Sequence, residues 1–219
     1  MMQHSESIEE YLKTLCKLGG GSRPISVSDL AERLNVSTVS VHEMIKKLVS
    51  QNLVTYQPYK GVSLTPAGVE AASRVLQRHR LWERFLHDVL GLPWAQVHEE
   101  AGRLEHATSP DVAEKLAKFL DNPASCPHGY PIMAGGECQD DPTARPLSEI
   151  PAGARSVIVR VPEDDPRLLS YMDELGLRPE TRLEVIDVAP FDGPITIEIS
   201  GQRKAISPQL ASQIVVRAA

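Results

Sequence analysis

The sequence predicts a mainly α-helical protein with α+β ends: a winged helix-turn-helix first, a helical middle, and a small β-barrel or α+β module last. Three observations lead to this prediction. Three short amphipathic segments and a hairpin pattern fill the first 65 residues, helical periodicity continues to about residue 121, and strand patterns dominate after residue 155.

The N-terminal segment contains three expected helices. Residues 5–18 form the first, and the run Gly19–Gly21 ends it. Ser26 or Ser28 can cap the second, which continues to Leu34. The third follows a short turn and covers residues 38–52. The apolar residues that share one side of the first helix are Ile8, Tyr11, Leu12, Leu15 and Leu18.

A hairpin follows the third helix. Residues 53–56 have a strand pattern, 58–61 a turn pattern, and 62–64 the pattern of a returning strand. Three helices followed by a hairpin are the plan of a winged helix-turn-helix, in which the second helix of the motif enters the major groove.

The rest of the chain divides by composition. We expect four helical stretches, near residues 66–79, 80–90, 93–107 and 110–121. Residues 122–154 are rich in Pro, Gly and Asp, which predicts a loop and linker, and strands interrupted by one short helix near residues 167–175 follow. The predicted domains are 1–65 for DNA binding, 66–140 for the helical part, 141–154 for a linker, and 155–219 for the barrel.

The amino-acid composition excludes several classes of protein. Hydrophobic residues make up 42% and charged residues 24%, which is typical of a globular protein. No apolar run is long enough to span a bilayer, and the N-terminus does not resemble a signal peptide, so we expect a cytoplasmic protein without a membrane partner.

The net charge of −6 argues against constitutive binding to nucleic acid. Residues 1–64 contain seven Lys or Arg and six Asp or Glu, which leaves that segment at about +1 (7 − 6). Such a surface adheres weakly to phosphates unaided, and bound divalent cations would reduce the acidic repulsion.

The expected recognition helix presents polar side chains at its start. Ser37 is the expected N-cap, and Lys60 at the tip of the wing is a candidate phosphate contact. The alternative is a packing module with an ordinary solvated face. The other candidate DNA-binding residues are Thr38, Ser40, His42, Glu43, Lys46 and Lys47.

Histidine and glutamate recur in the helical part. His79 and Glu83 are four residues apart and share a helix face, His98 lies on a later helix, and Glu105 and His106 follow two turns on. Glu10 of the first helix is a further candidate from a distant part of the chain. Imidazole and carboxylate ligands suit Mn²⁺, Fe²⁺, Co²⁺, Ni²⁺ and Zn²⁺. Solvated ion pairs are the alternative.

A second group of possible ligands lies in the connecting loop. Cys126, His128 and Cys138 could suggest a separate zinc site, but their spacing matches no strong zinc pattern. The sequence favours a structured loop here.

Several segments together resemble the diphtheria toxin repressor family of iron-dependent and manganese-dependent regulators, over almost the whole chain. They are AERLNVSTVSVHEMIKKL with LTPAG, RHRLWERFLHDVLGL, VHEEAGRLEH and CPHGYPI. The resemblance implies a winged helix, a helical dimerisation domain and a barrel resembling a Src-homology-3 fold. It also implies a homodimer on palindromic double-stranded operators, and repression of metal-uptake genes, with activation of export genes as the alternative.

The resemblance further implies two metal ions per subunit, Mn²⁺ or Fe²⁺. One site would use His79, Glu83 and His98 with a group from the barrel. Glu163 and Asp164 are the nearest candidates for that group. The other site would use Glu10, Glu105 and His106.

Three positions differ from one or both groups of relatives. A carboxylate at position 10 is the manganese-type choice, so Glu10 favours Mn²⁺. Gly102 replaces a ligand of the relatives and supplies no side chain, so either water or a backbone carbonyl fills that place or the second site is weak. Lys13 replaces a carboxylate of manganese-type relatives and argues against a binuclear cluster.

Two other functions each fit only part of the sequence. A zinc hydrolase with two histidines and a glutamate would lack a general base placed as in an HExxH helix, and would leave the winged helix unexplained. A regulator that senses an organic ligand or protein through the barrel would leave the His/Glu set unexplained. We therefore expect neither an enzyme nor an organic substrate.

Overall fold

The computed structural model describes residues 4–132 and 143–219. The chain forms two compact units. The first contains the residues up to His79 together with Gly102–Lys115, and the second contains Arg80–Ala101, Leu116–Pro131 and residues 143–219. Helices α4 and α5 each contribute residues to both units.

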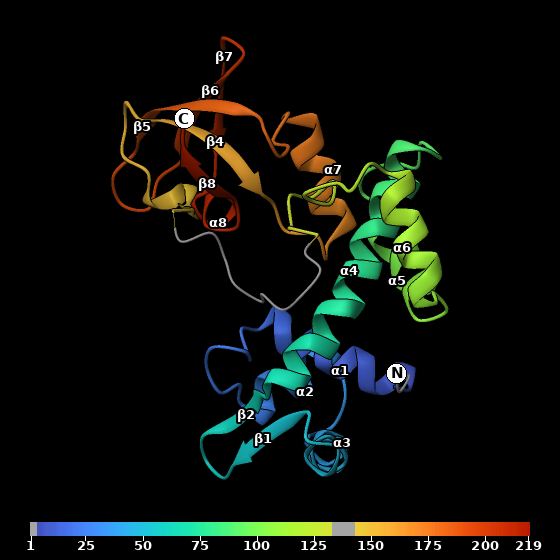
Figure 1. Cartoon of the computed structure of the whole chain (residues 1–219). Helices are drawn as coiled ribbons and strands as arrows, with labels where there is room; N and C mark the ends of the chain where they lie inside the picture. Colours follow the sequence, from blue (N-terminus) through green and yellow to red (C-terminus); the bar gives the residue numbers. More distant parts are fainter. Residues whose placement is uncertain (1–3, 133–142) are drawn as a thin grey trace. The chain divides into compact units, whose positions relative to one another are not determined.

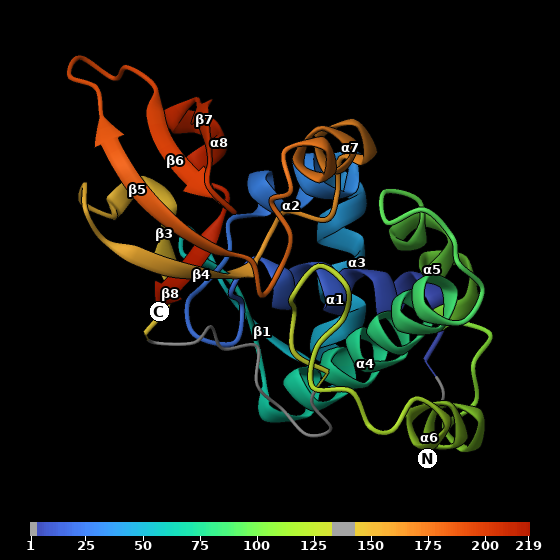
Figure 2. The same ribbon diagram turned by 90° about the horizontal axis from the view of Figure 1, so that it is seen from above.

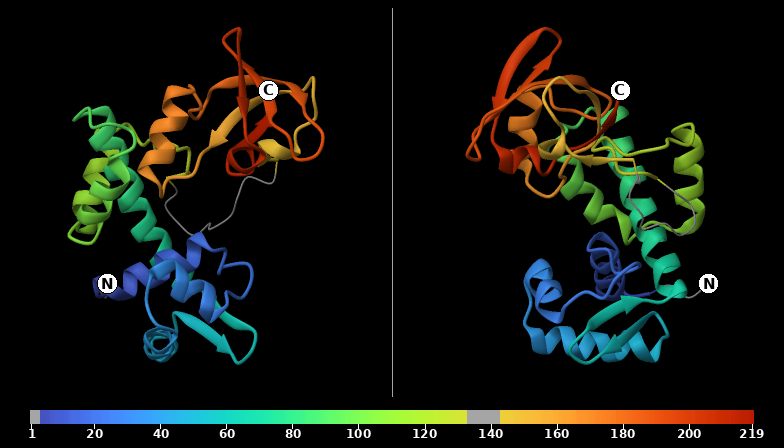
Figure 3. Two further views of the ribbon diagram at one scale, coloured as in Figure 1. Left: turned by 180° about the vertical axis from the view of Figure 1, so that it is seen from behind. Right: turned by 90° about the vertical axis from the view of Figure 1, so that its left-hand side faces the viewer.

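The beginning of the first unit is a winged helix-turn-helix, as predicted (Figure 1). Helices α1 (Glu6–Lys17), α2 (Val27–Leu34) and α3 (Thr38–Ser50) precede an antiparallel hairpin of β1 (Val54–Gln57) and β2 (Gly61–Leu64). The caps are those expected: Ser26 accepts a hydrogen bond from the backbone of Asp29, and Ser37 from that of Ser40. In Figure 3 the hairpin lies beside α3.

One apolar core holds these elements together. Leu12, Leu15, Leu30 and Leu48 are fully buried in it, together with Ile45. Helices α2 and α3 each bury one apolar stripe and leave the opposite face exposed, whereas α1 is buried on most sides and also covers the polar side chains of Glu9, Lys13 and Thr14. The first half of α4 packs on this core through Ala72 and Leu76.

Helix α4 (Pro66–Asp88) is uninterrupted, so the predicted division between residues 79 and 80 is wrong (Figure 3). The reason is local: no glycine or proline follows Gly68 before the helix ends, so nothing interrupts the ladder of hydrogen bonds. Helices α5 (Val97–Glu105) and α6 (Pro110–Phe119) follow, near the predicted positions.

The second unit contains a six-stranded antiparallel sheet in the order β3-β8-β4-β5-β6-β7 (Figure 2). Its core includes Ile158, Leu169, Met172 and Val185, all fully buried. The strands are β3 (Arg145–Pro146), β4 (Arg155–Arg160), β5 (Arg182–Val188), β6 (Ile195–Ile199), β7 (Gln202–Ile206) and β8 (Val215–Ala218).

Three short helices complete this unit. Helix α7 (Pro166–Glu174) is the expected one, capped by Asp165. The 3₁₀ helix η1 (Leu147–Glu149) and strand β3 lie within the stretch that reads as a linker in the sequence. Helix α8 (Pro208–Ala211) begins after Ser207, which caps it. No helix among residues 4–132 and 143–219 is long and apolar enough to cross a membrane.

Candidate metal centres and DNA-binding surface

Four buried side chains form a group of potential metal ligands in the second unit. Glu83 of α4, Cys126 and His128 of the connecting loop, and Glu163 before α7 each offer one ligand atom, all within 4.8 Å of one another. All four side chains are at most 3% exposed. We call this group the buried centre.

The loop of the buried centre is folded by its own backbone and by strand β4. The amide of Cys126 donates to the carbonyl of Tyr130, and that of Gly129 to Cys126. The amide of Val161 donates to the carbonyl of His128, which fixes the loop to the end of β4. The ring of Tyr130 lies 5.5 Å from the guanidinium carbons of Arg80 and Arg160.

Trp94 orients the imidazole of the centre. Its indole N–H donates to the carbonyl of Pro127 (3.2 Å), and its ring lies against His128. Nε2 of His128 lies 3.2 Å from the carbonyl oxygen of Trp94, which only an N–H can satisfy. Burial opposes protonation of the ring, but the carboxylate of Glu83 beside Nδ1 raises the pKa of His128, so an ion bound through Nδ1 would displace a proton while the Nε2–H contact keeps the ring oriented.

The residues fit a divalent cation. Nδ1 of His128 is buried, lies 3.3 Å from Oε1 of Glu83, and makes no hydrogen bond within the described residues. Two carboxylates, Glu83 and Glu163, are buried close together, an arrangement that is costly unless positive charge compensates it. Burial, with the neighbouring carboxylates, raises the pKa of the Cys126 thiol, so binding through sulfur would release a proton.

His98 adds a further donor beside this centre. Its Nδ1 lies 2.8 Å from Oε1 of Glu83 and 4.0 Å from Oε2 of Glu163, and its Nε2 lies 3.6 Å from Asp164. The structure thus brings together four of the predicted ligands within the second unit. Cys126 and His128, which the sequence suggested only as part of a separate zinc site with Cys138, lie beside Glu83 instead, and Cys138 lies outside the described residues. Their place in a Cys-Pro-His-Gly turn was the available signal.

The second predicted set lies in the first unit. Glu10 of α1 meets Glu105 and His106 at the end of α5, again with ligand atoms within 4.8 Å. Here, however, Nζ of Lys13 lies 2.7 Å from Glu10 and 2.6 Å from Glu105. Gly102 supplies no donor, and a β-carbon there would meet nothing within 4 Å.

Neighbouring groups complete this second cluster. His79 makes its hydrogen bond here, from Nδ1 to Oε2 of Glu105 (2.6 Å). Glu9 accepts from Arg78 and from His106, both at 2.8 Å. Burial opposes ionisation of Glu105, but hydrogen bonds from His106 and His79, with the charge of Lys13, hold its pKa well below the usual range.

The DNA-binding candidates share one exposed surface. Every predicted residue of α3 and its cap is solvent-exposed, as is Lys60 of the wing. The ring of His42 packs edge-on against Tyr56 of β1, which orients it. Val39 was missed: it is apolar yet 70% exposed at the start of α3, where a side chain can contact a thymine methyl group.

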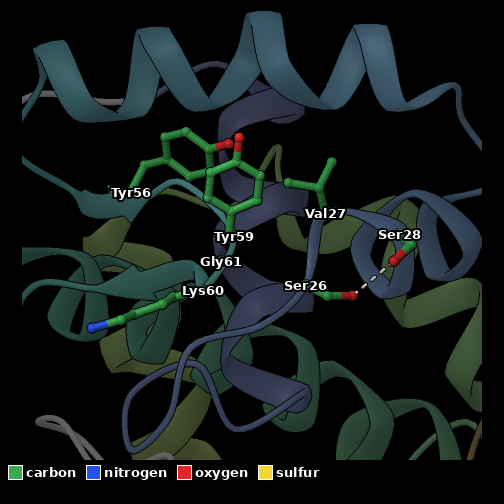
Figure 4. A pocket seen from close by; sticks show the side chains of 7 residues that line it. All are labelled: Ser26, Val27, Ser28, Tyr56, Tyr59, Lys60 and Gly61. Atoms are coloured by element: carbon green, nitrogen blue, oxygen red, sulfur yellow. Dashed lines mark hydrogen bonds between the residues drawn. The ribbon is translucent and has the colours of Figure 1, made fainter.

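A shallow cavity of about 180 Å³ lies between the start of α2 and the wing (Figure 4). Hydroxyl groups, aromatic rings and one lysine line it, a mixture that suits contact with a sugar-phosphate backbone. The lining residues are Ser26, Val27, Ser28, Tyr56, Tyr59, Lys60 and Gly61.

Comparison with known proteins assigns a family to these features. Three family models match in order: the iron-dependent repressor N-terminal DNA-binding domain (residues 3–62), the iron-dependent repressor metal-binding and dimerisation domain (65–134), and the FeoA domain (145–218). The iron-dependent repressor IdeR of Mycobacterium tuberculosis is 34% identical over 216 residues, covering 93% of each chain. This chain belongs to the diphtheria toxin repressor family.

Other members of the family match this chain along nearly their whole length. The diphtheria toxin repressor of Corynebacterium efficiens is 30% identical, with 96% of this chain and 95% of the relative covered. A solved manganese-dependent transcriptional repressor in complex with manganese has a TM-score of 0.88 at 34% identity, over 97% of this chain and 100% of its own. ScaR with bound Zn²⁺ has a TM-score of 0.82 at 32% identity, with 97% and 99% covered.

Family membership confirms the predicted function at the level of class. The chain is a metal-dependent transcriptional repressor and not an enzyme. Its domains indicate DNA and a second copy of the chain as partners. The ligand sets, the DNA-contacting residues and the identity of the ion stay predictions.

Proposed function

We propose that this repressor is controlled by a divalent ion, Mn²⁺ or Fe²⁺, held in the buried centre. The observation that carries the proposal is the meeting of Glu83, Cys126, His128 and Glu163, all buried, within 4.8 Å. His98 and Asp164 are the additional donors on the more exposed side.

The chemical nature of the ligand atoms in the buried centre influences which ion it binds. A thiolate softens a site that otherwise offers nitrogen and oxygen, so Zn²⁺ and Fe²⁺ compete strongly with Mn²⁺ in solution. Glu10 no longer supports Mn²⁺, because its carboxylate pairs with Lys13. Availability in the cell therefore selects the ion. Solved relatives named for bound manganese and zinc are consistent with this breadth.

The proposed control acts through helix α4. Glu83 belongs to the same uninterrupted helix that carries Arg78 and His79 into the first unit. An ion stabilises the DNA-binding state only by its differential affinity for that state. In the homodimer that state would space the two recognition helices by about 34 Å, as a palindromic operator requires. The protein would then repress metal-uptake genes in the cytoplasm.

The test is DNA affinity with and without metal. An operator selected from random duplexes in Mn²⁺ should bind the wild type at least about 100-fold more tightly with Mn²⁺ than with chelator. His128→Ala should lose most of that ratio. His87→Ala is the matched control, because His87 lies on α4 beside Asp88 and outside the buried centre.

Three ions should be compared on the same duplex: Mn²⁺, anaerobic Fe²⁺ and Zn²⁺. A His128→Ala protein that keeps the wild-type response to all three would overturn the buried centre as the controlling site. Equal affinity of the wild type with and without metal would overturn metal control itself.

A further inference from the structure

Lys13 lies where the second metal ion of the subunit was expected. Its ammonium contacts Oε2 of Glu10 at 2.7 Å and Oε1 of Glu105 at 2.6 Å. These are two of the three side chains in the predicted set. The third, His106, places Nε2 3.1 Å from the same oxygen of Glu105. A cation bound by this set would have to share the carboxylates of Glu10 and Glu105 with the ammonium, which already contacts one oxygen of each.

The ammonium is also sheltered. The side chain of Lys13 is 10% exposed and that of Glu105 is fully buried. A buried ion pair is costly to break from one side, because the remaining charge loses its partner away from water. An incoming ion would therefore have to expel Lys13 from its place or bind next to another positive charge. Neither is favourable.

The charges of the cluster are already close to balance. The carboxylates of Glu9, Glu10 and Glu105 face the permanent cations of Lys13 and Arg78. Two imidazoles complete the group: the hydrogen bond to Glu105 raises the pKa of His106, and His79 also bonds Glu105. Adding a dication to this group would leave excess positive charge.

The residue at position 102 also argues against a metal ion in this cluster. Residue 102 stands one turn before Glu105 and His106 on α5, and it is glycine, with open space where a side chain would lie. The set therefore lacks a donor on one side and contains a built-in cation on another. The residues present do not fit a metal ion.

We infer that the Lys13 ammonium replaces the second metal ion, permanently joining α1 to α5, so that each subunit uses one regulatory ion. The inference rests on the proposed function for the remaining ion. Removing Lys13 should convert the cluster into an ion-binding site, because buried Glu105 then lacks that partner and an external cation can supply it.

The experiment counts bound metal. Full-length wild type is dialysed against Mn²⁺, and metal per subunit is measured by mass spectrometry of the dissolved metal. Lys13→Met removes the ammonium and keeps the length of the side chain. Lys13→Arg keeps a cation. Lys115→Met is the matched control, because Lys115 pairs with Asp111 at 2.8 Å on the surface.

We expect one ion per subunit in the wild type, in Lys13→Arg and in Lys115→Met, and two in Lys13→Met. Glu10→Gln should remove the extra ion from the Lys13→Met protein and leave the wild-type count unchanged. Without metal, Lys13→Met should melt about 5–15 °C below the wild type. Mn²⁺ should then raise its melting point more than it raises that of the wild type.

Two results would overturn the inference. One is a second ion in the wild type that disappears with Glu10→Gln or His106→Ala. The other is a folded Lys13→Met protein that still binds one ion and gains no extra stabilisation from Mn²⁺. If Lys13→Met does not fold, the number of metal ions per subunit in the wild type and in Glu10→Gln tests the inference. One ion in both proteins supports it, and an ion lost in Glu10→Gln contradicts it.

Failure of the proposed function would look different. In that case the wild type would bind no ion at the buried centre, or its affinity for the operator would be the same with and without metal. Either result would be independent of the metal counts of the Lys13 variants. A count of one that falls to zero in His128→Ala supports both proposals together.

Discussion

A β-carbon on Gly129 would lie 2.0 Å from the carbonyl oxygen of Val159, so the turn carrying Cys126 and His128 is pressed directly against strand β4. The backbone of Gly129 also has φ +92°, a conformation that other residues adopt at a cost. The position of the two proposed ligands Cys126 and His128 therefore depends on a residue that has no side chain to offer a metal ion.

Gly129→Ala should weaken Mn²⁺ binding by about 10- to 100-fold, the range seen when groups that orient metal ligands are removed. The added methyl group must push the turn away from β4 and displace His128. Titration calorimetry with Mn²⁺ measures the effect. Gly201→Ala is the control, because Gly201 has a similar φ of +79° with nothing within 4 Å. Equal losses in both variants would contradict this account.

Lys60→Ala should weaken binding to every duplex by a similar factor. Lys60 is exposed at the wing and lies beside the shallow cavity, so its expected partner is a phosphate rather than a base. The slope of log affinity against log salt should fall in magnitude by about one. Lys115→Ala should leave the slope unchanged. A change in sequence preference instead would assign Lys60 to base contacts.

Asp165 should stabilise the barrel in a pH-dependent way. Backbone hydrogen bonds from Arg167 and Leu168 hold the pKa of its carboxyl below the usual value. A lowered pKa in the folded state means that the contribution is present at neutral pH and is lost as the pH falls through that pKa.

The comparison uses Asp165→Asn, which keeps a capping oxygen but cannot titrate, and Asp165→Ala, which removes the cap. In metal-free buffer at neutral pH, urea unfolding should rank Asp165→Ala as the least stable. The advantage of the wild type over Asp165→Asn should shrink in acid. An advantage that grows as the pH falls would reverse the sign and refute the assignment.

Gly102→Glu should act only when Lys13 is absent. The open space at residue 102 can hold a carboxylate that faces the cluster of Glu105 and His106. In the Lys13→Met background we expect the extra Mn²⁺ site to tighten by about 10-fold, or roughly 1.4 kcal/mol. With Lys13 in place the substitution should add no ion, because the ammonium still neutralises the carboxylates. Metal per subunit after dialysis against Mn²⁺ is measured for Gly102→Glu with and without Lys13. An extra ion in the protein that keeps Lys13 would contradict the prediction.

The sequence by itself determined most of the elements and the class of protein, although it divided α4 in two and gave no sign of β3 or η1. Apolar residues at helical spacing, such as Leu12 and Leu15, required a buried stripe on α1, and Ser37 marked the start of α3. These are local signals. For the same reason the sequence identified Glu83, His98, Glu105 and His106 as chemically suited to metal.

Only the tertiary structure decided which of these groups meet. Cys126 and Glu83 are far apart in the chain, and the turn against β4 brings them together. Lys13 was visible as a departure from the family, but its contact with Glu105 joins residues 92 positions apart. Electrostatic energy depends on distance in space and on burial, and neither is set by spacing along the chain.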